Sequence, residues 1–347
     1  MGTAGRSVKG SDMTIYARAA RFAAVVGIGL SVLQGFSGIA VAQELQTIRI
    51  SAVPGSIMGV DFRAGIAEGF FARHGLKLEI AELATGTNNI TATINGSADI
   101  GYADIFAGLS SISNGFDIGL VAPNNGLGQN WFVLVREDSD IATAKDLEKR
   151  TVALGAPPQF KAITSAWLDA QGADPSAVSF TIVQDQTTYG SLLETRQVDA
   201  IATASSVNAF RWIADHKFRL IGERNLGKLR LAEGSPIAGW WVTRQWYDAN
   251  TELATRFRDA LRESIAWYSG LSIEERARHF LDQTTVDLVA LDKKTPGVLE
   301  LTAGSYPGFK TPVDLEKLRV WIEIGARYAN VPKGVDLEAH ILPTSRN

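Results

Sequence analysis

Small polar side chains recur in this sequence where short apolar runs end, and they are of kinds that hold a small molecule by hydrogen bonds. Thr87 and Asn88 follow one such run, Asp104 ends a second and Asn124 ends a third. A helix that begins beyond such a run offers free N–H groups, which favour an anion. The Asp104 carboxylate could instead receive an amine. Each residue could also cap a helix or shape a turn, so these roles stay open.

The stretch Pro54 to Gly59 is the first polar loop that follows an apolar run, and it contains Pro54 and Ser56. Its glycines permit a ligand to approach the backbone closely. An ordinary turn between a strand and a helix is the alternative. We expect Pro54 and Ser56 to contact a ligand, because ligands bind beyond the carboxyl ends of parallel strands.

A second group of candidates lies in the middle of the chain. Gln159, Phe160 and Lys161 stand at the predicted start of a helix, where a lysine opposes the helix dipole. A bound anion would relieve that opposition, although a solvated lysine is an equal alternative. Thr203 opens a cluster of three hydroxyls, Thr203 to Ser206, that could donate hydrogen bonds.

Three tryptophans could form an aromatic wall. Trp240 and Trp241 are neighbours in a predicted strand, so only one of them can face a given side. Trp131 lies in another apolar run. Large aromatic residues in strands are more often part of a core than of a ligand site, and we take Trp240 as the candidate contact.

The inventory of catalytic residues is small. The chain has four histidines and no cysteine, and it lacks the motifs H-E-x-x-H, G-x-S-x-G and the P-loop. The histidines show no metal-binding spacing. We therefore predict a protein that is not an enzyme and that holds no metal or cofactor. A net charge of −3 argues against a nucleic-acid partner.

Apolar runs alternate with segments of helical period over most of the chain, which predicts α/β structure with parallel sheets. The predicted strands are 47–53, 77–83, 99–103, 118–123, 131–135, 151–155, 179–183, 200–203, 219–222 and 238–243. The last third is helical. Residues 1–42 combine basic residues, an apolar run and an Ala40-Val41-Ala42 ending, which is typical of a removed signal peptide. A membrane anchor is the alternative reading of that segment.

Several segments match a known family in order. Gly69 to Glu79, Asn95 to Gly101, Ile141 to Leu154 and Val198 to Ala200 resemble the periplasmic binding proteins of ABC importers for nitrate, sulfonate, taurine and thiamine precursors. The resemblance implies a type II periplasmic-binding-protein fold, with two α/β lobes joined by a two-strand hinge and a helical C-terminal tail. It places lobe 1 at 43–131 plus 239–347 and lobe 2 at 132–238.

The resemblance also implies a function. It predicts a monomer in the periplasm that captures a small organic anion by hinge closure and delivers it to a permease with its ATPase. The permease would be the only link to the membrane. Two alternatives remain: an enzyme of the same fold, and a ligand-sensing module for a membrane receptor. The thiamine-pyrimidine synthases and sulfinate desulfinases that share this fold rely on cysteine, which this chain lacks, so such an enzyme would need a different nucleophile.

Overall fold

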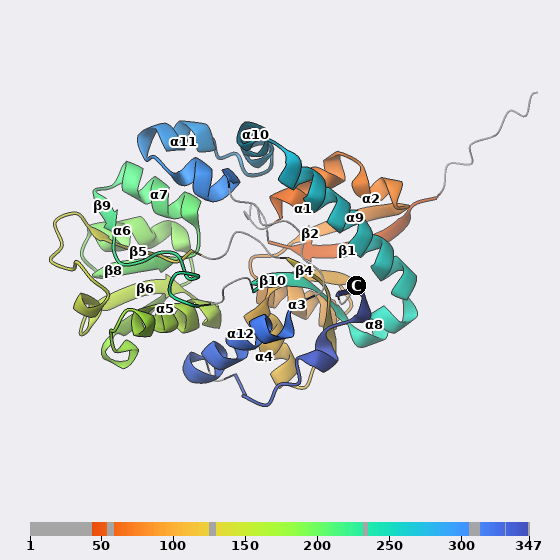
Figure 1. Cartoon of the computed structure of the whole chain (residues 1–347), viewed down its shortest axis with the longest axis horizontal. Helices are drawn as coiled ribbons and strands as arrows, with labels where there is room; N and C mark the ends of the chain where they lie inside the picture. The colour runs from red at the N-terminus through yellow and green to blue at the C-terminus, as the bar shows by residue number, and fades with distance from the viewer. Residues whose placement is uncertain are drawn as a thin grey trace, which may run out of the picture. The chain divides into compact units, whose positions relative to one another are not determined.

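The computed structural model describes residues 44–53, 59–124, 130–231, 235–304, 313–329 and 331–345, all within one unit, Gln43–Asn347. The predicted signal peptide, residues 1–42, lies outside the described residues, as do Pro54 and Ser56. Two five-stranded sheets organise this unit (Figure 1). We use "lobe 1" for the first sheet with the helices packed on it and "lobe 2" for the second.

The first sheet has the order β2-β1-β3-β10-β4, in which β1 is parallel to β2 and β3 while β10 is antiparallel to β3 and β4. Its strands are β1 (Gln46–Ala52), β2 (Leu76–Glu82), β3 (Ile100–Asp104), β4 (Ile118–Asn124) and β10 (Ala238–Thr243). The sequence predicts parallel sheets, and in this sheet the returning strand β10 departs from that prediction. It is inserted between two strands that precede it by more than a hundred residues.

The second sheet repeats this plan with the order β7-β6-β8-β5-β9. Here β6 is parallel to β7 and β8, while β5 is antiparallel to β8 and β9. Its strands are β5 (Phe132–Arg136), β6 (Thr151–Gly155), β7 (Ser179–Val183), β8 (Ala200–Thr203) and β9 (Phe218–Leu220).

Helices cover both sheets and form most of the last third of the chain. They are α1 (Val60–Ala67), α2 (Phe70–Arg73), α3 (Gly86–Ile94), α4 (Ile105–Ser113), α5 (Pro158–Ala170), α6 (Tyr189–Glu194), α7 (Ser206–Asp215), α8 (Arg244–Ala249), α9 (Thr251–Gly270), α10 (Ile273–Thr284), α11 (Leu288–Lys294) and α12 (Leu315–Tyr328). Short helical turns are η1 (Lys145–Leu147), η2 (Pro175–Ala177), η3 (Gln186–Thr188), the π-helical η4 (Glu300–Gly304), η5 (Glu338–His340) and η6 (Pro343–Ser345).

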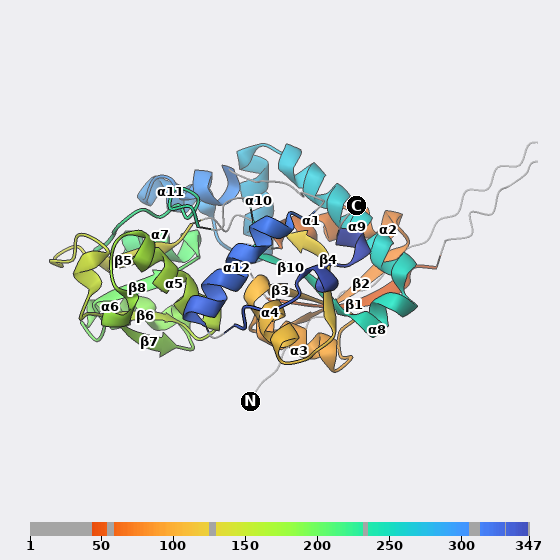
Figure 2. The ribbon, with the colours of Figure 1, turned by 60° about the horizontal axis from the view of Figure 1, so that its bottom comes forward.

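The chain passes from the first sheet to the second between β4 and β5, and returns between β9 and β10. The predicted lobe boundaries at 131/132 and 238/239 stay a prediction. The helical tail does not keep to one lobe. The helices α11 and η4 pack on α7, and α12 packs on both α4 and α5, between which it lies in Figure 2.

The two faces of the first sheet carry separate hydrophobic cores, and the neighbours Trp240 and Trp241 belong to different ones. Trp240 packs among Phe62 of α1 and Phe257 of α9. Trp241 packs with α3, α4 and α12 on the opposite face. The alternation of side chains along β10 therefore ties both helical layers to one strand.

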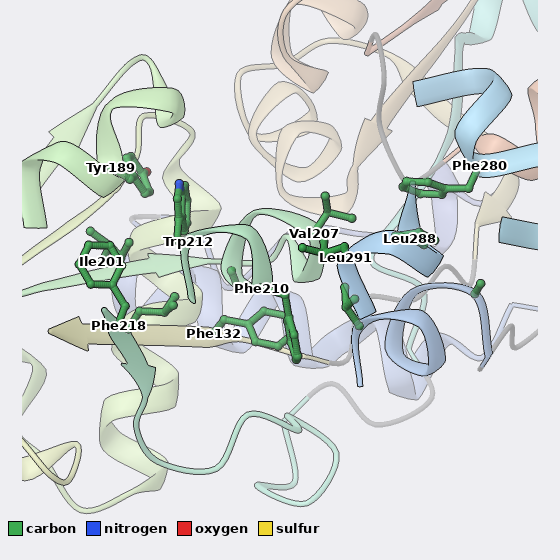
Figure 3. Close-up of a cluster of buried hydrophobic side chains, with 14 of the residues drawn as sticks. Phe132, Tyr189, Ile201, Val207, Phe210, Trp212, Phe218, Phe280, Leu288 and Leu291 are labelled. Carbon is green, nitrogen blue, oxygen red and sulfur yellow. The ribbon is translucent and has the colours of Figure 1, made fainter. Parts of the chain in front are cut away.

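A third core joins the two lobes through the tail. It contains Val60 of α1, Phe132 of β5, Phe210 of α7, Phe280 of α10 and Leu288 of α11, all buried. Figure 3 shows Phe132, Phe210, Phe280 and Leu288 of this core, which come from β5, α7, α10 and α11. Packing between the lobes is thus continuous along this edge of the molecule.

Local sequence signals explain several element ends. Ser272 and Glu275 form a capping box at the start of α10. Gly69 has φ +77° and separates α1 from α2. The helix α12 starts at Leu315, with Asp314 as its N-cap.

Gly108 is a sensitive point of this packing, because it lies in the middle of α4 against the ring of Trp241. A Cβ added at Gly108 would overlap the buried indole, which has no room to move. We expect Gly108→Ala to lower the free energy of unfolding by about 1–3 kcal/mol in urea titrations. Gly270→Ala at the end of α9, where a Cβ meets nothing within 4 Å, should leave it unchanged or raise it. Equal effects of the two substitutions would contradict this account.

Candidate functional site

The returning strand β10 brings two predicted site residues close together. Ala238, its first residue, pairs with Asp104 on one side and with Asn124 on the other. Asp104 ends β3 and Asn124 ends β4, so both side chains stand at one end of the first sheet. The sequence places these two residues twenty positions apart, and the register of β10 aligns them.

Tyr102 interacts with both residues, through a hydrogen bond with Asn124 and through the charge of Asp104. The amide Nδ2 of Asn124 donates a hydrogen bond of 3.1 Å to the Tyr102 hydroxyl, and both residues are buried. Burial raises the pKa of Tyr102 well above its ordinary value, and the charges of Asp61 and Asp104 raise it further, while the bond from Asn124 lowers it. The Tyr102 hydroxyl therefore stays protonated and can donate a hydrogen bond to a neighbouring acceptor.

Asp104 also accepts a hydrogen bond that crosses from lobe 2 to lobe 1. Its Oδ1 accepts 2.9 Å from the N–H of Ala107 and so caps α4. Its Oδ2 accepts 3.0 Å from Nε2 of Gln159, in the first turn of α5 in lobe 2. Burial raises the pKa of the Asp104 carboxyl to about 6, although backbone N–H bonds, that of Ala107 first, act in the opposite direction.

Three helices begin around this carboxylate. Asp104 caps α4, and Gln159 lies in the first turn of α5. A Cβ on Gly86, the first residue of α3, would stand 3.0 Å from the Asp104 Oδ2. Thr85 caps α3 through the N–H of Asn88, whereas α5 begins without a side-chain cap. The N-terminal ends of these helices concentrate partial positive charge here.

Thr87 and Asn88 belong to the first turn of α3 and are exposed. In lobe 2, Thr203 is buried at the end of β8, and its hydroxyl accepts 3.1 Å from the N–H of Ser205. Ser205 in turn caps α7, and the hydroxyl of Ser206 bonds that of Thr302 in η4 at 2.8 Å. This hydroxyl cluster serves helix starts and tail contacts, and none of its bonds among the described residues reaches Asp104.

The tryptophan candidates are buried, and Phe160 is partly buried. The ring of Trp240 lies 4.8 Å from that of Tyr102, so Trp240 supports the polar cluster from within the core. Its Nε1 has no hydrogen-bond partner among the described residues. Phe160 packs against Trp131 with 5.6 Å between ring centroids, beneath the start of α5.

Lys161 points elsewhere. Its Nζ lies 5.9 Å from the ring centre of Phe180, and the residue is exposed. It lines a depression of about 780 Å³ shared with Asp169 and Arg327, away from Asp104. The anion contact that we expected from Lys161 stays a prediction.

Sequence reasoning missed two members of this site, Tyr102 and Asp61. Tyr102 precedes Asp104 by two residues, and in a strand that spacing puts both side chains on one face. This signal was available. Asp61 is buried in the first turn of α1 and gives no such signal, because its nearness to Tyr102 depends on how α1 packs on the sheet.

Two α/β lobes of equivalent topology, with a polar cluster where their helices begin, are the plan of the periplasmic-binding-protein fold. The chain superimposes on the periplasmic aliphatic sulphonate binding protein SsuA from Escherichia coli with a TM-score of 0.66 at 16% identity, covering 87% of this chain and 93% of that one. It is similar to the alkanesulfonate-binding protein SsuA from Xanthomonas axonopodis pv. citri, with a TM-score of 0.66 at 16% identity over 86% and 99% of the two chains.

A third similar structure is the periplasmic nitrate-binding protein NrtA from Synechocystis PCC 6803, with a TM-score of 0.65 at 15% identity over 86% and 85% of the chains. Identity this low establishes the fold and leaves the ligand open. The family model described as NMT1/THI5 like matches residues 62–269, more than half of the chain. The chain belongs to this family, which confirms the resemblance seen in the sequence. No curated protein sequence matches it.

Two further observations concern the described residues alone. They contain no group of three or more histidine, cysteine, aspartate or glutamate residues placed to hold a metal ion. No helix among them is long and apolar enough to cross a membrane.

The raised pKa of Asp104 predicts a pH dependence of stability. Because the folded-state pKa, about 6, exceeds the ordinary aspartate value of 3.8, the folded protein binds more protons than the unfolded chain between these values. The contribution of Asp104 to stability therefore falls as pH rises from about 4 to 6. Asp104→Asn keeps a capping side chain and removes this titration. In urea unfolding, we expect the variant to gain stability relative to the parent over that window. Parallel pH profiles would rule the assignment out.

Proposed function

We propose that this protein is the solute-binding component of an ABC importer, and that it holds a small organic anion between its two lobes. The single observation behind the proposal is the Asp104–Gln159 hydrogen bond, which joins the lobes where α3, α4 and α5 begin. A solute bound here would contact both lobes, and membership of the NMT1/THI5-like family supports this role.

Hinge closure is the proposed mechanism. The solute binds one lobe first, and contacts from the other lobe then stabilise the closed arrangement because the solute has a higher affinity for that state. Gln159 offers such a contact, since its amide already reaches lobe 1. The proposed contacts are Pro54, Ser56, Thr87, Asn88, Asp104, Asn124, Gln159, Phe160, Lys161 and Thr203, with Trp240 behind them.

The N-terminal ends of these helices favour an anion, because they carry partial positive charge and their free N–H groups can donate hydrogen bonds to it. Asp104 opposes an anion when it is ionised. Its pKa of about 6 makes protonation cheap, and the neutral acid can donate a hydrogen bond to a sulfonate or carboxylate. Phe160 and Trp131 would pack against the organic part of the solute.

A zwitterion is the second candidate solute, and a specific observation favours it. Asp61 and Asp104 both lie close enough to Tyr102 to raise its pKa, so two carboxylates share this end of the first sheet. An amine on the solute would pair with Asp104.

We further propose export to the periplasm and a monomer that meets the membrane through a permease with its ATPase. Turnover of a bound ligand would favour an enzyme instead, and a neighbouring gene for a receptor kinase would favour a sensor.

A thermal-shift screen of residues 43–347 against sulfonates, nitrate, aromatic acids and amino acids tests the proposal. A true solute at a hundred times its dissociation constant should stabilise the fold by about 2.7 kcal/mol. Gln159→Ala should weaken binding by about 0.5–1.5 kcal/mol, because a hydrogen bond is lost. The control Gln197→Ala removes an exposed amide that bonds only Thr195 Oγ1 and should change nothing. If no class of solute stabilises the protein, the importer role fails.

The pH dependence of solute affinity separates the two solute classes. An anion beside Asp104 binds more tightly as pH falls through about 6, since protonation removes the opposing charge. A solute whose amine pairs with Asp104 shows the reverse. Titration calorimetry between pH 5 and 8 measures the slope, and Asp104→Asn should flatten it in either case. Tighter binding above pH 6 would reject the anion.

A further inference from the structure

A cavity of about 470 Å³ lies along α3 and α4, and we call it the α3–α4 groove; Thr87 and Gln159 line it and also belong to the proposed solute contacts. Thr87, Thr91 and Ile94 of α3 form one wall, and residues from Phe106 to Ser113 of α4 form the other. Pro158 and Gln159 at the start of α5 close one part, and Val331 after α12 lies at another. The volume is that of a pocket for a small molecule.

The walls of the α3–α4 groove carry no formal charge: every described residue that lines it is uncharged. Asp104 lies next to the groove without lining it, and its two carboxylate oxygens are engaged by Ala107 and Gln159. A charged ligand would lose hydration in the groove without meeting a counter-charge, which costs several kcal/mol in an apolar setting. A neutral ligand avoids this cost.

Apolar and polar groups both contribute to the walls. Ile94, Phe106 and Val331 offer carbon surface, and Phe116 lines the groove while 45% exposed, which is unusual for a phenylalanine. Thr91, Ser111 and Ser113 donate their hydroxyl hydrogens to carbonyls four residues back, at 3.0, 3.0 and 2.8 Å. Their oxygens are thus left as acceptors, which suit a ligand with a hydrogen-bond donor.

We propose that the α3–α4 groove is a second binding site, for a neutral molecule with an aromatic or aliphatic body and one hydroxyl or amide donor. Through Gln159, binding in the groove would affect the contact between the two lobes. The residue lines the groove and also holds the Asp104–Gln159 bond between the lobes. A ligand that packs on α3, α4 and the start of α5 together favours the arrangement in which this bond is made.

Benzyl alcohol and benzoate are matched probes of this site, because they share a ring and differ in charge. The methyl NMR signals of Ile94 and Val331 report on the groove directly. We expect benzyl alcohol to shift both signals saturably. Thr91→Phe fills the groove and should abolish the shift. The control Thr255→Phe replaces an α9 threonine whose hydroxyl makes the same bond to a carbonyl four residues back, at 2.8 Å, and should retain it.

The shifts measured with the two probes decide whether the second site exists and whether it prefers a neutral ligand. Absence of a saturable benzyl alcohol shift in the parent protein, or an equal shift in Thr91→Phe, overturns the second site. A benzoate shift that Thr91→Phe removes overturns the preference for neutral ligands. Benzoate binding that survives Thr91→Phe with no change at Ile94 supports that preference, because it places the anion outside the groove. The solute screen described above uses a different set of variants, so either proposal can fail alone.

Discussion

The insertion of β10 between β3 and β4 is the constraint on which the rest of the structure depends. It completes the first sheet only after the chain has built the whole of the second, so the second sheet becomes an insertion within the first lobe. The same pairing sets Asp104, Ala238 and Asn124 side by side. It also sends Trp240 and Trp241 into two cores on opposite faces. Backbone pairing, two hydrophobic layers and the polar cluster thus depend on one six-residue strand.

The two sheets have equivalent strand orders, yet the ends at which their strands lead into capped helices differ in charge. In each lobe the strand beside the antiparallel one leads into a capped helix: β3 into α4 through Asp104, and β8 into α7 through Ser205. A carboxylate and a hydroxyl both cap a helix, and only the carboxylate adds a charge. Burial then raises the pKa of Asp104 to about 6. The junction is therefore asymmetric: lobe 1 supplies a titratable group, while lobe 2 supplies the neutral amide of Gln159 and an uncapped helix start.

Much of the fold was predictable from the sequence because strands and caps are local. The structure has β6, β7, β8 and β10 at the predicted residues, and the capping box of α10 is present. Contacts set by packing were not predictable. The hydrogen bond between Gln159 and Asp104 joins residues that are fifty-five positions apart, and the approach of Asp61 to Tyr102 depends on how α1 lies on the sheet. The direction of the Lys161 side chain was not predictable for the same reason, since the sequence locates it in the first turn of α5 and leaves the face of the helix open.

The tail sets limits on any motion between the lobes. One interlobe core runs from α1 through α10 and α11 to α7, and on the other side α12 packs on both α4 and α5. The Arg327–Asp169 ion pair on that side is largely exposed, so it adds little. The buried residues of α5 in the shared core are the small Ala162 and Ala166, which interlock only shallowly with a neighbouring helix, and the partly buried Ile163 packs against the same core. Helices in such contact can slide over short distances without exposing much apolar surface, whereas separating them would expose it all. The closure that we propose would therefore require sliding at the α5–α12 contact, with the tail moving as part of the hinge.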